Sequence, residues 1–86
     1  MTSYAITFAR SARKDLEALN RPLIARILKR IEALAEDPRP PGCRKLVGQA
    51  NLWRVRIGDY RVIYEIDDGK KLVDINAIRH RSEAYR

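Results

Sequence analysis

The sequence predicts a small α+β domain in which a helical hairpin packs on one face of a β-sheet. The chain has 86 residues, and 45% of them are hydrophobic, which suits one compact domain with a single core. Its apolar residues recur with helical spacing only between residues 11 and 36, and with strand-like alternation on either side. Two glycine-containing pairs, Gly58-Asp59 and Asp68-Gly69, separate the later strand-like runs. We therefore expect one domain over residues 1–86 in the order β-α-α-β-β-β.

The first strand and the two helices account for the N-terminal half of the chain. Residues 3–8 alternate between larger apolar and small residues, which predicts a strand. We expect Ser11 to cap the first helix, and Asn20 to cap the second with Pro22 in its first turn. The second helix should end near Glu36, since a residue that precedes a proline is driven out of the helical region. The short break makes the helices an antiparallel hairpin.

Three strand-like runs fill the C-terminal half, over residues 52–57, 60–67 and 71 to about 79. If each glycine pair is a two-residue turn, Ile57 lies opposite Tyr60, and Tyr64 lies opposite Val73. One face of this three-strand antiparallel meander then collects the apolar residues Trp53, Val55, Ile57, Tyr60, Val62, Tyr64, Val73 and Ile75. We expect the helices to cover this face.

The other face of the sheet carries three arginines, Arg54, Arg56 and Arg61. In the same register Arg56 lies directly opposite Arg61, and like charges in such pairs destabilise a sheet. Three crowded guanidinium groups therefore indicate a site for an anion such as a phosphate, which they would hold with forked, permanently charged donors. The alternative is that Glu65 and Asp74 on the same face neutralise them.

The overall charge of the chain also favours an anionic partner. Eighteen Lys and Arg stand against 11 Asp and Glu, which gives a formal net charge of +7. This favours RNA or DNA as a partner over an acidic small molecule, although a solvated basic face without a partner has the same composition. The single cysteine excludes an internal disulfide, and the single histidine leaves no plausible zinc cluster, so we expect neither metal nor cofactor. We also expect a cytoplasmic protein with no leader peptide and no membrane contact.

The last residues add His80, Arg81 and Tyr85 beyond the third run. Strand alternation places His80 on the face of the three arginines if the strand continues that far. Imidazole exchanges protons near neutral pH, which makes His80 a candidate general base, although a lone histidine is also common as a packing residue. Tyr85 could stack on a nucleobase.

Two segments resemble the RelE/ParE toxin superfamily. The run Leu52–Tyr64 is similar to its central hairpin, and His80–Arg86 is similar to its closing motif. Residues 8–16 and 45–48 match as well, so the likeness covers nearly the whole chain. The resemblance implies a small toxin that a cognate antitoxin neutralises.

The resemblance leaves three functions open. RelE-like members bind in the ribosomal A site and cleave mRNA, with the 2′-OH attacking the adjacent phosphate. ParE-like members share the fold but inhibit DNA gyrase and need no nuclease residues. A degenerate toxin that only forms complexes is the third possibility.

The RelE-like pattern also implies site residues, at Arg54, Arg56, Arg61, Arg81 and Tyr85. Arg54 and Arg56 would position the phosphate, Arg61 would stabilise the transition state, and Arg81 the leaving 5′-oxygen. Some members carry lysines at the first two positions, and arginine cannot act as a base there. His80 or Tyr85 would therefore transfer the proton.

The expected partners follow from the same resemblance and from the charge. A surface with a net charge of +7 should attract an acidic, partly disordered antitoxin segment. Operator DNA would be bound only through the complex with the antitoxin.

Overall fold

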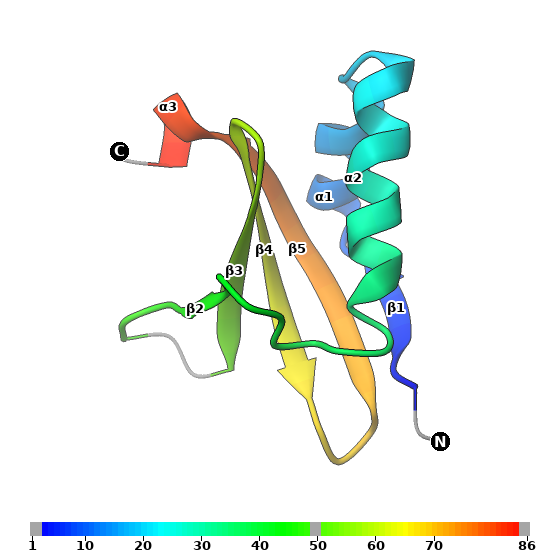
Figure 1. Cartoon of the computed structure of the whole chain (residues 1–86), viewed down its shortest axis with the longest axis vertical. Helices are drawn as coiled ribbons and strands as arrows, with labels where there is room; N and C mark the ends of the chain where they lie inside the picture. The colour runs from blue at the N-terminus through cyan, green and yellow to red at the C-terminus, as the bar shows by residue number, and fades with distance from the viewer. Residues whose placement is uncertain (1–2, 49–50, 85–86) are drawn as a thin grey trace.

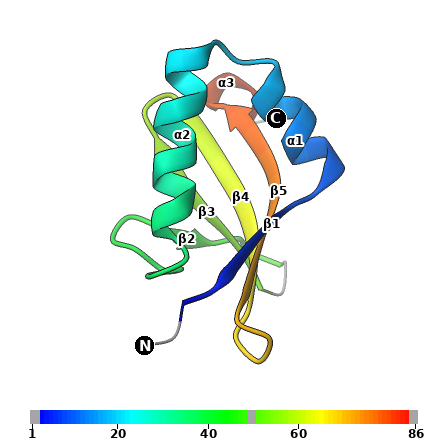
Figure 2. The same cartoon turned by 90° about the vertical axis from the view of Figure 1, so that its right-hand side faces the viewer.

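The helices and the sheet form two layers. The computed structural model describes residues 3–48 and 51–84, with these elements in chain order: β1 (Ala5–Phe8), α1 (Arg10–Glu17), α2 (Arg21–Ala33), β2 (Arg44–Lys45), β3 (Leu52–Ile57), β4 (Tyr60–Asp67), β5 (Leu72–His80) and α3 (Arg81–Ala84). Helices α1 and α2 lie on one side of the sheet, while α3 leaves the end of β5 on the opposite side (Figures 1 and 2). The predicted α+β class, with a helical hairpin on one sheet face, is confirmed.

The sheet has five strands in the order β1-β5-β4-β3-β2. Strands β3, β4 and β5 form the predicted antiparallel meander, and β1 runs parallel to β5 at one edge. The sequence did not predict β2 at the other edge. Its two residues are too few to show an alternation, and they follow a proline-rich connector.

The two helices begin in different ways. Asn20 caps α2 as predicted, since its Oδ1 accepts a hydrogen bond from the backbone N of Leu23 at 3.0 Å. The prediction for Ser11 was wrong: α1 begins at Arg10, with Ala9 as its N-cap and no side-chain cap. The backbone N of Ala9 is held by the carbonyl of Ile75 at 2.8 Å, which turns the chain into the helix before Ser11 is reached.

The first hairpin has the predicted register, with Ile57 opposite Tyr60 and Arg56 opposite Arg61. The second hairpin does not. Asp67 pairs with Leu72, so the turn is the loop 68–71 and not a two-residue turn at Asp68-Gly69. The Oδ1 of Asp67 accepts a hydrogen bond from the backbone N of Lys70 at 2.9 Å, which stabilises the longer turn.

Tyr64 consequently lies opposite Ile75 and not opposite Val73. Because the register moved by two residues, Val73 and Ile75 still face the core, and both have 0% exposure.

A β-bulge at Asn76 changes the second half of β5. Ile75 pairs with Tyr64 but Ala77 pairs with Ile63, so Asn76 is an extra residue on β5. The bulge reverses the alternation beyond it. In consequence Arg79 lies opposite Arg61, and His80 lies opposite Tyr60.

Helix α1 supports the bulge from the edge of the sheet beyond the end of β1. Ser11 Oγ donates a hydrogen bond to the carbonyl of Asn76 at 2.9 Å, and Asp15 Oδ2 accepts one from the backbone N of Ile78 at 3.0 Å. Asp15 Oδ1 also lies 3.6 Å from a guanidinium nitrogen of Arg79. The backbone groups that β1 leaves unpaired on β5 thus find side-chain partners.

The core lies between the helices and the apolar sheet face. Ile27, Ile31 and Leu34 of the α2 segment belong to one buried cluster with Val62 and Tyr64, and Tyr64 has 0% exposure. The predicted apolar face of the sheet is therefore the face that the helices cover.

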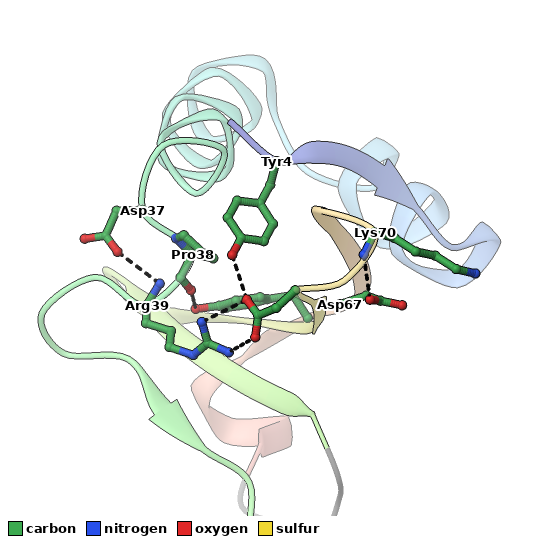
Figure 3. Close-up of polar contacts among 8 residues, drawn as sticks. Tyr4, Asp37, Pro38, Arg39, Asp67 and Lys70 are labelled. Atoms are coloured by element: carbon green, nitrogen blue, oxygen red, sulfur yellow. Dashed lines mark hydrogen bonds and ion pairs between the residues drawn. The ribbon is translucent and has the colours of Figure 1, made fainter. Parts of the chain in front are cut away.

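The connector between α2 and β2 is fixed to the sheet at two points (Figure 3). The hydroxyl of Tyr64 donates a hydrogen bond of 2.7 Å to the buried carbonyl of Pro38. Arg39 forms a two-pronged contact with Asp68, at 2.9 and 3.3 Å, and its guanidinium lies 5.0 Å from the ring centroid of Trp53. These contacts hold the residues that follow, up to β2, against β3.

The Asp68 carboxylate is stabilised in its charged form. It accepts hydrogen bonds from Arg39 and, at 2.6 Å, from the hydroxyl of Tyr4, and these bonds lower the pKa of Asp68 to about 2. A carboxyl with a lowered pKa contributes stability that is complete above its unfolded-state pKa, ~3.9, and is lost as the pH falls through the folded value.

We expect Asp68→Asn to lower the free energy of unfolding by the same small amount at every pH between about 5 and 7. The difference from wild type should shrink between about pH 4 and pH 2, because wild type then loses the charge as well. Urea unfolding at several pH values measures this difference in the free energy of unfolding. The control is Asp59→Asn, an exposed carboxylate that forms no ion pair with the described residues. A difference that stays constant down to pH 2 would contradict the assignment.

Candidate functional site

Four arginines from three neighbouring strands line a groove on the sheet face that α1 and α2 leave uncovered. We call Arg44, Arg54, Arg56 and Arg61 the arginine cluster. Arg44 of β2 pairs with Arg54 of β3, and Arg56 pairs with Arg61 of β4. The groove, which we call the first groove, has a volume of about 370 Å³ and is completed by Pro41, Gly42 and Val55. The structure thus brings together the three predicted arginines and adds Arg44.

Arg61 lies at the centre of this arrangement. Its cross-strand neighbours are Arg56 on one side and Arg79 on the other, and its side chain is buried, with 6% exposure. A buried guanidinium with an arginine opposite it on each neighbouring strand favours an anion as the ligand of the first groove.

The alternative expectation, that Glu65 and Asp74 neutralise the arginines, is wrong. Glu65 and Asp74 lie opposite each other on the neighbouring strands β4 and β5. Asp74 also accepts a hydrogen bond of 2.7 Å from the hydroxyl of Thr7. In residues 3–48 and 51–84, neither Arg54 nor Arg56 forms an ion pair with a carboxylate.

The uncovered face is divided into zones by charge. Ile63 follows the arginine cluster along β4, and beyond it a separate cavity of about 390 Å³ is lined by three carboxylates, Glu65, Asp67 and Asp74, against one cation, Lys70. An anionic ligand is therefore attracted to one end of the face and repelled from the other.

The turn at Gly58-Asp59 positions two of the predicted site residues. Gly58 has a φ of 60°, a left-handed conformation that glycine adopts without steric cost. Its carbonyl accepts a hydrogen bond from the Nε of Arg56 at 3.1 Å, and the carbonyl of Asp59 accepts one from the backbone N of Arg81 at 2.7 Å. The turn therefore orients the Arg56 side chain and anchors the start of α3.

His80 is not on the face of the arginine cluster, so this prediction of its placement was wrong. The bulge at Asn76 puts it opposite Tyr60, and the two rings meet edge to face with their centroids 5.2 Å apart. His80 Nδ1 accepts a hydrogen bond from the backbone N of Ser82 at 3.2 Å. Arg79, and not His80, lies on the face of the arginine cluster, opposite Arg61.

The remaining two predicted residues belong to the C-terminal segment. Arg81 is exposed at the start of α3, on the side of the sheet away from α1 and α2 (Figure 1). Tyr85 lies outside the described residues. Arg44 was not predicted as a site residue. The only signal for it was a cation next to Lys45 in a segment too short to predict a strand.

In the part of the chain that the structure describes, no helix is long and apolar enough to cross a lipid bilayer. Residues 3–48 and 51–84 also contain no group of three or more His, Cys, Asp or Glu side chains arranged to hold a metal ion.

The fold and the groove define a class of small basic proteins with a cationic sheet face, and comparison with known proteins gives the family. Residues 6–85 match the family model described as the ParE toxin of type II toxin–antitoxin systems, parDE. The chain therefore belongs to the RelE/ParE family of toxins from type II toxin–antitoxin systems.

Individual relatives agree with this assignment. The chain is 31% identical to the toxin RelG of Mycobacterium tuberculosis, over 96% of this chain and 97% of that protein. It is 33% identical to the toxin RelE of the same organism, over 96% of this chain and 87% of that protein. Its structure is similar to that of a chain in a RelBE toxin–antitoxin complex from Mycobacterium tuberculosis, with a TM-score of 0.84, 30% identity and 95% coverage of both chains.

Proposed function

We propose that this toxin is a ribosome-dependent mRNA endoribonuclease that inhibits translation. The observation that carries the proposal is the arginine cluster, which gathers Arg54, Arg56 and Arg61 with Arg44 in one groove. Four permanently charged, forked donors are suited to a phosphodiester and to the additional negative charge of its transition state.

The roles follow from the positions in the groove. Arg61, buried at the centre, would contact the phosphoryl group as the 2′-oxygen attacks it. Arg54 and Arg56 would hold the phosphate. Arg81 lies outside the groove, at the start of α3, and its role in stabilising the leaving 5′-oxygen follows from the resemblance to RelE-like toxins alone. Arginine does not release a proton near neutral pH, so another group must accept the proton of the 2′-OH. The position of His80 beside Tyr60 favours Tyr85 over His80 for this step.

Primer extension on a translated mRNA tests the proposal. After induction of the protein in cells, we expect new 5′ ends inside codons, and with purified components we expect cleavage only when ribosomes are present. Growth arrest with intact mRNA would contradict the proposal.

A second candidate function is inhibition of DNA gyrase, which the match to the ParE family model favours. In that case purified gyrase should lose supercoiling activity when the protein is added, and Arg61→Ala should leave toxicity largely unchanged. The two assays separate the candidates, because each function predicts a loss that the other does not.

We also propose that a cognate antitoxin neutralises the protein in the cytoplasm by covering the arginine cluster with an acidic segment. Support comes from the similar Mycobacterium tuberculosis toxin, which is seen in a toxin–antitoxin complex, and from the net charge of +7. Operator DNA would be bound through that complex. The rate of association should fall as ionic strength rises, since attraction between the opposite charges speeds the encounter.

A further inference from the structure

A second groove adjoins the first groove at the β2 edge of the sheet. It has a volume of about 610 Å³ and is lined by Arg44, Lys45, Leu46, Val47, Arg54, Arg61 and Ile63. Three of these residues, Arg44, Arg54 and Arg61, also line the first groove. The two grooves therefore meet along the arginine cluster, and a ligand held there reaches into both.

The second groove differs from the first in having an apolar side. Leu46 and Val47 come from the segment after β2, and Ile63 comes from β4, where it lies opposite Arg54. Val47 has 98% exposure. A single exposed valine is ordinary on a protein surface. Here, however, it joins two other apolar side chains in a groove that has cations along its rim.

We propose that the second groove seats a nucleobase of the RNA whose phosphate the arginine cluster holds; this rests on the proposed function. A nucleotide carries an anionic phosphate and a flat, largely apolar base about one sugar apart. The arginine cluster matches the first, and Leu46, Val47 and Ile63 match the second. The base face would lie on the apolar side chains, and the rim cations would meet acceptor atoms on its edge.

The distribution of charge on the uncovered sheet face favours the β2 side of the arginine cluster, where the second groove lies, as the place for the base. Towards the opposite end three carboxylates outnumber the single cation Lys70, so that end is net negative and would repel the phosphates on either side of a nucleotide. Towards β2 the groove is bordered by Arg44 and Lys45. A nucleotide chain leaving the cluster is therefore drawn towards the second groove.

A nucleobase also suits this groove better than an apolar side chain of a protein partner. Such a side chain carries no charge, so the attraction of Arg44, Lys45 and Arg54 for an anion would contribute nothing to its binding. A nucleotide brings a phosphate on each side of its base.

Binding of short RNA by the purified toxin tests the inference. The probes are labelled trinucleotides with 2′-O-methyl groups, which block cleavage, either intact or with one base removed at each position in turn. Fluorescence anisotropy gives the dissociation constants at several salt concentrations. The variants are Val47→Ser, Val47→Leu as the conservative control, and Ala25→Ser, an apolar-to-serine change on an exposed position of α2. Since Val47 is almost wholly exposed, its replacement leaves the core intact.

We expect wild type to bind the intact trinucleotide more tightly than one of the abasic probes. Val47→Ser should reduce that preference about five-fold, the effect of losing roughly half of a buried valine side chain. It should leave the affinity for that abasic probe and the salt dependence of binding unchanged. Val47→Leu and Ala25→Ser should retain the preference.

Two results would overturn the inference while the proposed function stands: no loss of affinity for any abasic probe, or a preference that Val47→Ser leaves intact. If Val47→Ser weakens binding of an acidic antitoxin peptide and leaves the base preference intact, the groove binds a protein segment instead. Failure of wild type to bind any probe at low salt would also overturn the inference, whereas the proposed function is decided separately by primer extension in the presence of ribosomes.

Discussion

Replacing Arg61 by alanine should slow single-turnover mRNA cleavage on programmed ribosomes by about 10²–10³-fold, the usual effect of losing one donor that stabilises transition-state charge. The loss should be similar at every pH, because a guanidinium does not titrate in the accessible range. Arg61 stands out among the arginines because it is buried at 6% exposure and has an arginine opposite it on each neighbouring strand. In the proposed function the negative charge of the transition state develops beside this guanidinium.

Two controls accompany this measurement. Arg61→Lys keeps the charge but loses the forked donor, and should recover only part of the rate. Arg13→Ala removes one charge from the exposed side of α1 and should leave the rate nearly unchanged. Circular dichroism and thermal unfolding must show that the Arg61 variants are folded. If a folded Arg61→Ala variant cleaves as fast as wild type, the arginine cluster is not the reaction centre.

Replacing Tyr64 by phenylalanine should lower the free energy of unfolding by about 1–3 kcal/mol, since the buried carbonyl of Pro38 loses its donor. Burial raises the pKa of Tyr64 well above its ordinary value, so the hydroxyl remains protonated and continues to donate. Urea unfolding followed by circular dichroism measures the change.

Tyr60→Phe is the matched control, because in the described residues the hydroxyl of Tyr60 makes no hydrogen bond. It should change the free energy of unfolding by much less than Tyr64→Phe. Equal effects of the two substitutions would mean that the bond from Tyr64 to Pro38 contributes nothing to stability, and that the connector is held by Arg39 alone.

The sequence predicted the parts of the fold that follow from repeated local patterns. The alternation on β3 and β4 and the glycine at position 58 were enough to give the first hairpin and its register, and hence the meeting of Arg56 with Arg61. The cap at Asn20 was equally local.

Strand β2 was missed because it is only two residues long, whereas the errors at Ser11, in the second hairpin and at His80 depended on contacts between distant segments. The loop 68–71 is stabilised partly by bonds from Asp68 to Arg39 and Tyr4, which lie far away in the chain. The bulge at Asn76 is held by Ser11 of α1, the residue that was expected to cap the helix. A period-two pattern contains no information about either contact, and so the position of His80 could not be predicted.

The bulge has a consequence for how sequences of this family are compared. Because Asn76 is the extra residue, deleting it would let the pairing of Tyr64 with Ile75 run on regularly and would leave Arg79 opposite Arg61. If Asn76 instead took a regular place in the strand, Ile78 would stand opposite Arg61 and His80 would turn to the same face of the sheet. Two relatives with identical C-terminal motifs can therefore present different chemical groups to this face, and the residue count of β5 distinguishes them only when it is read together with the presence of the bulge.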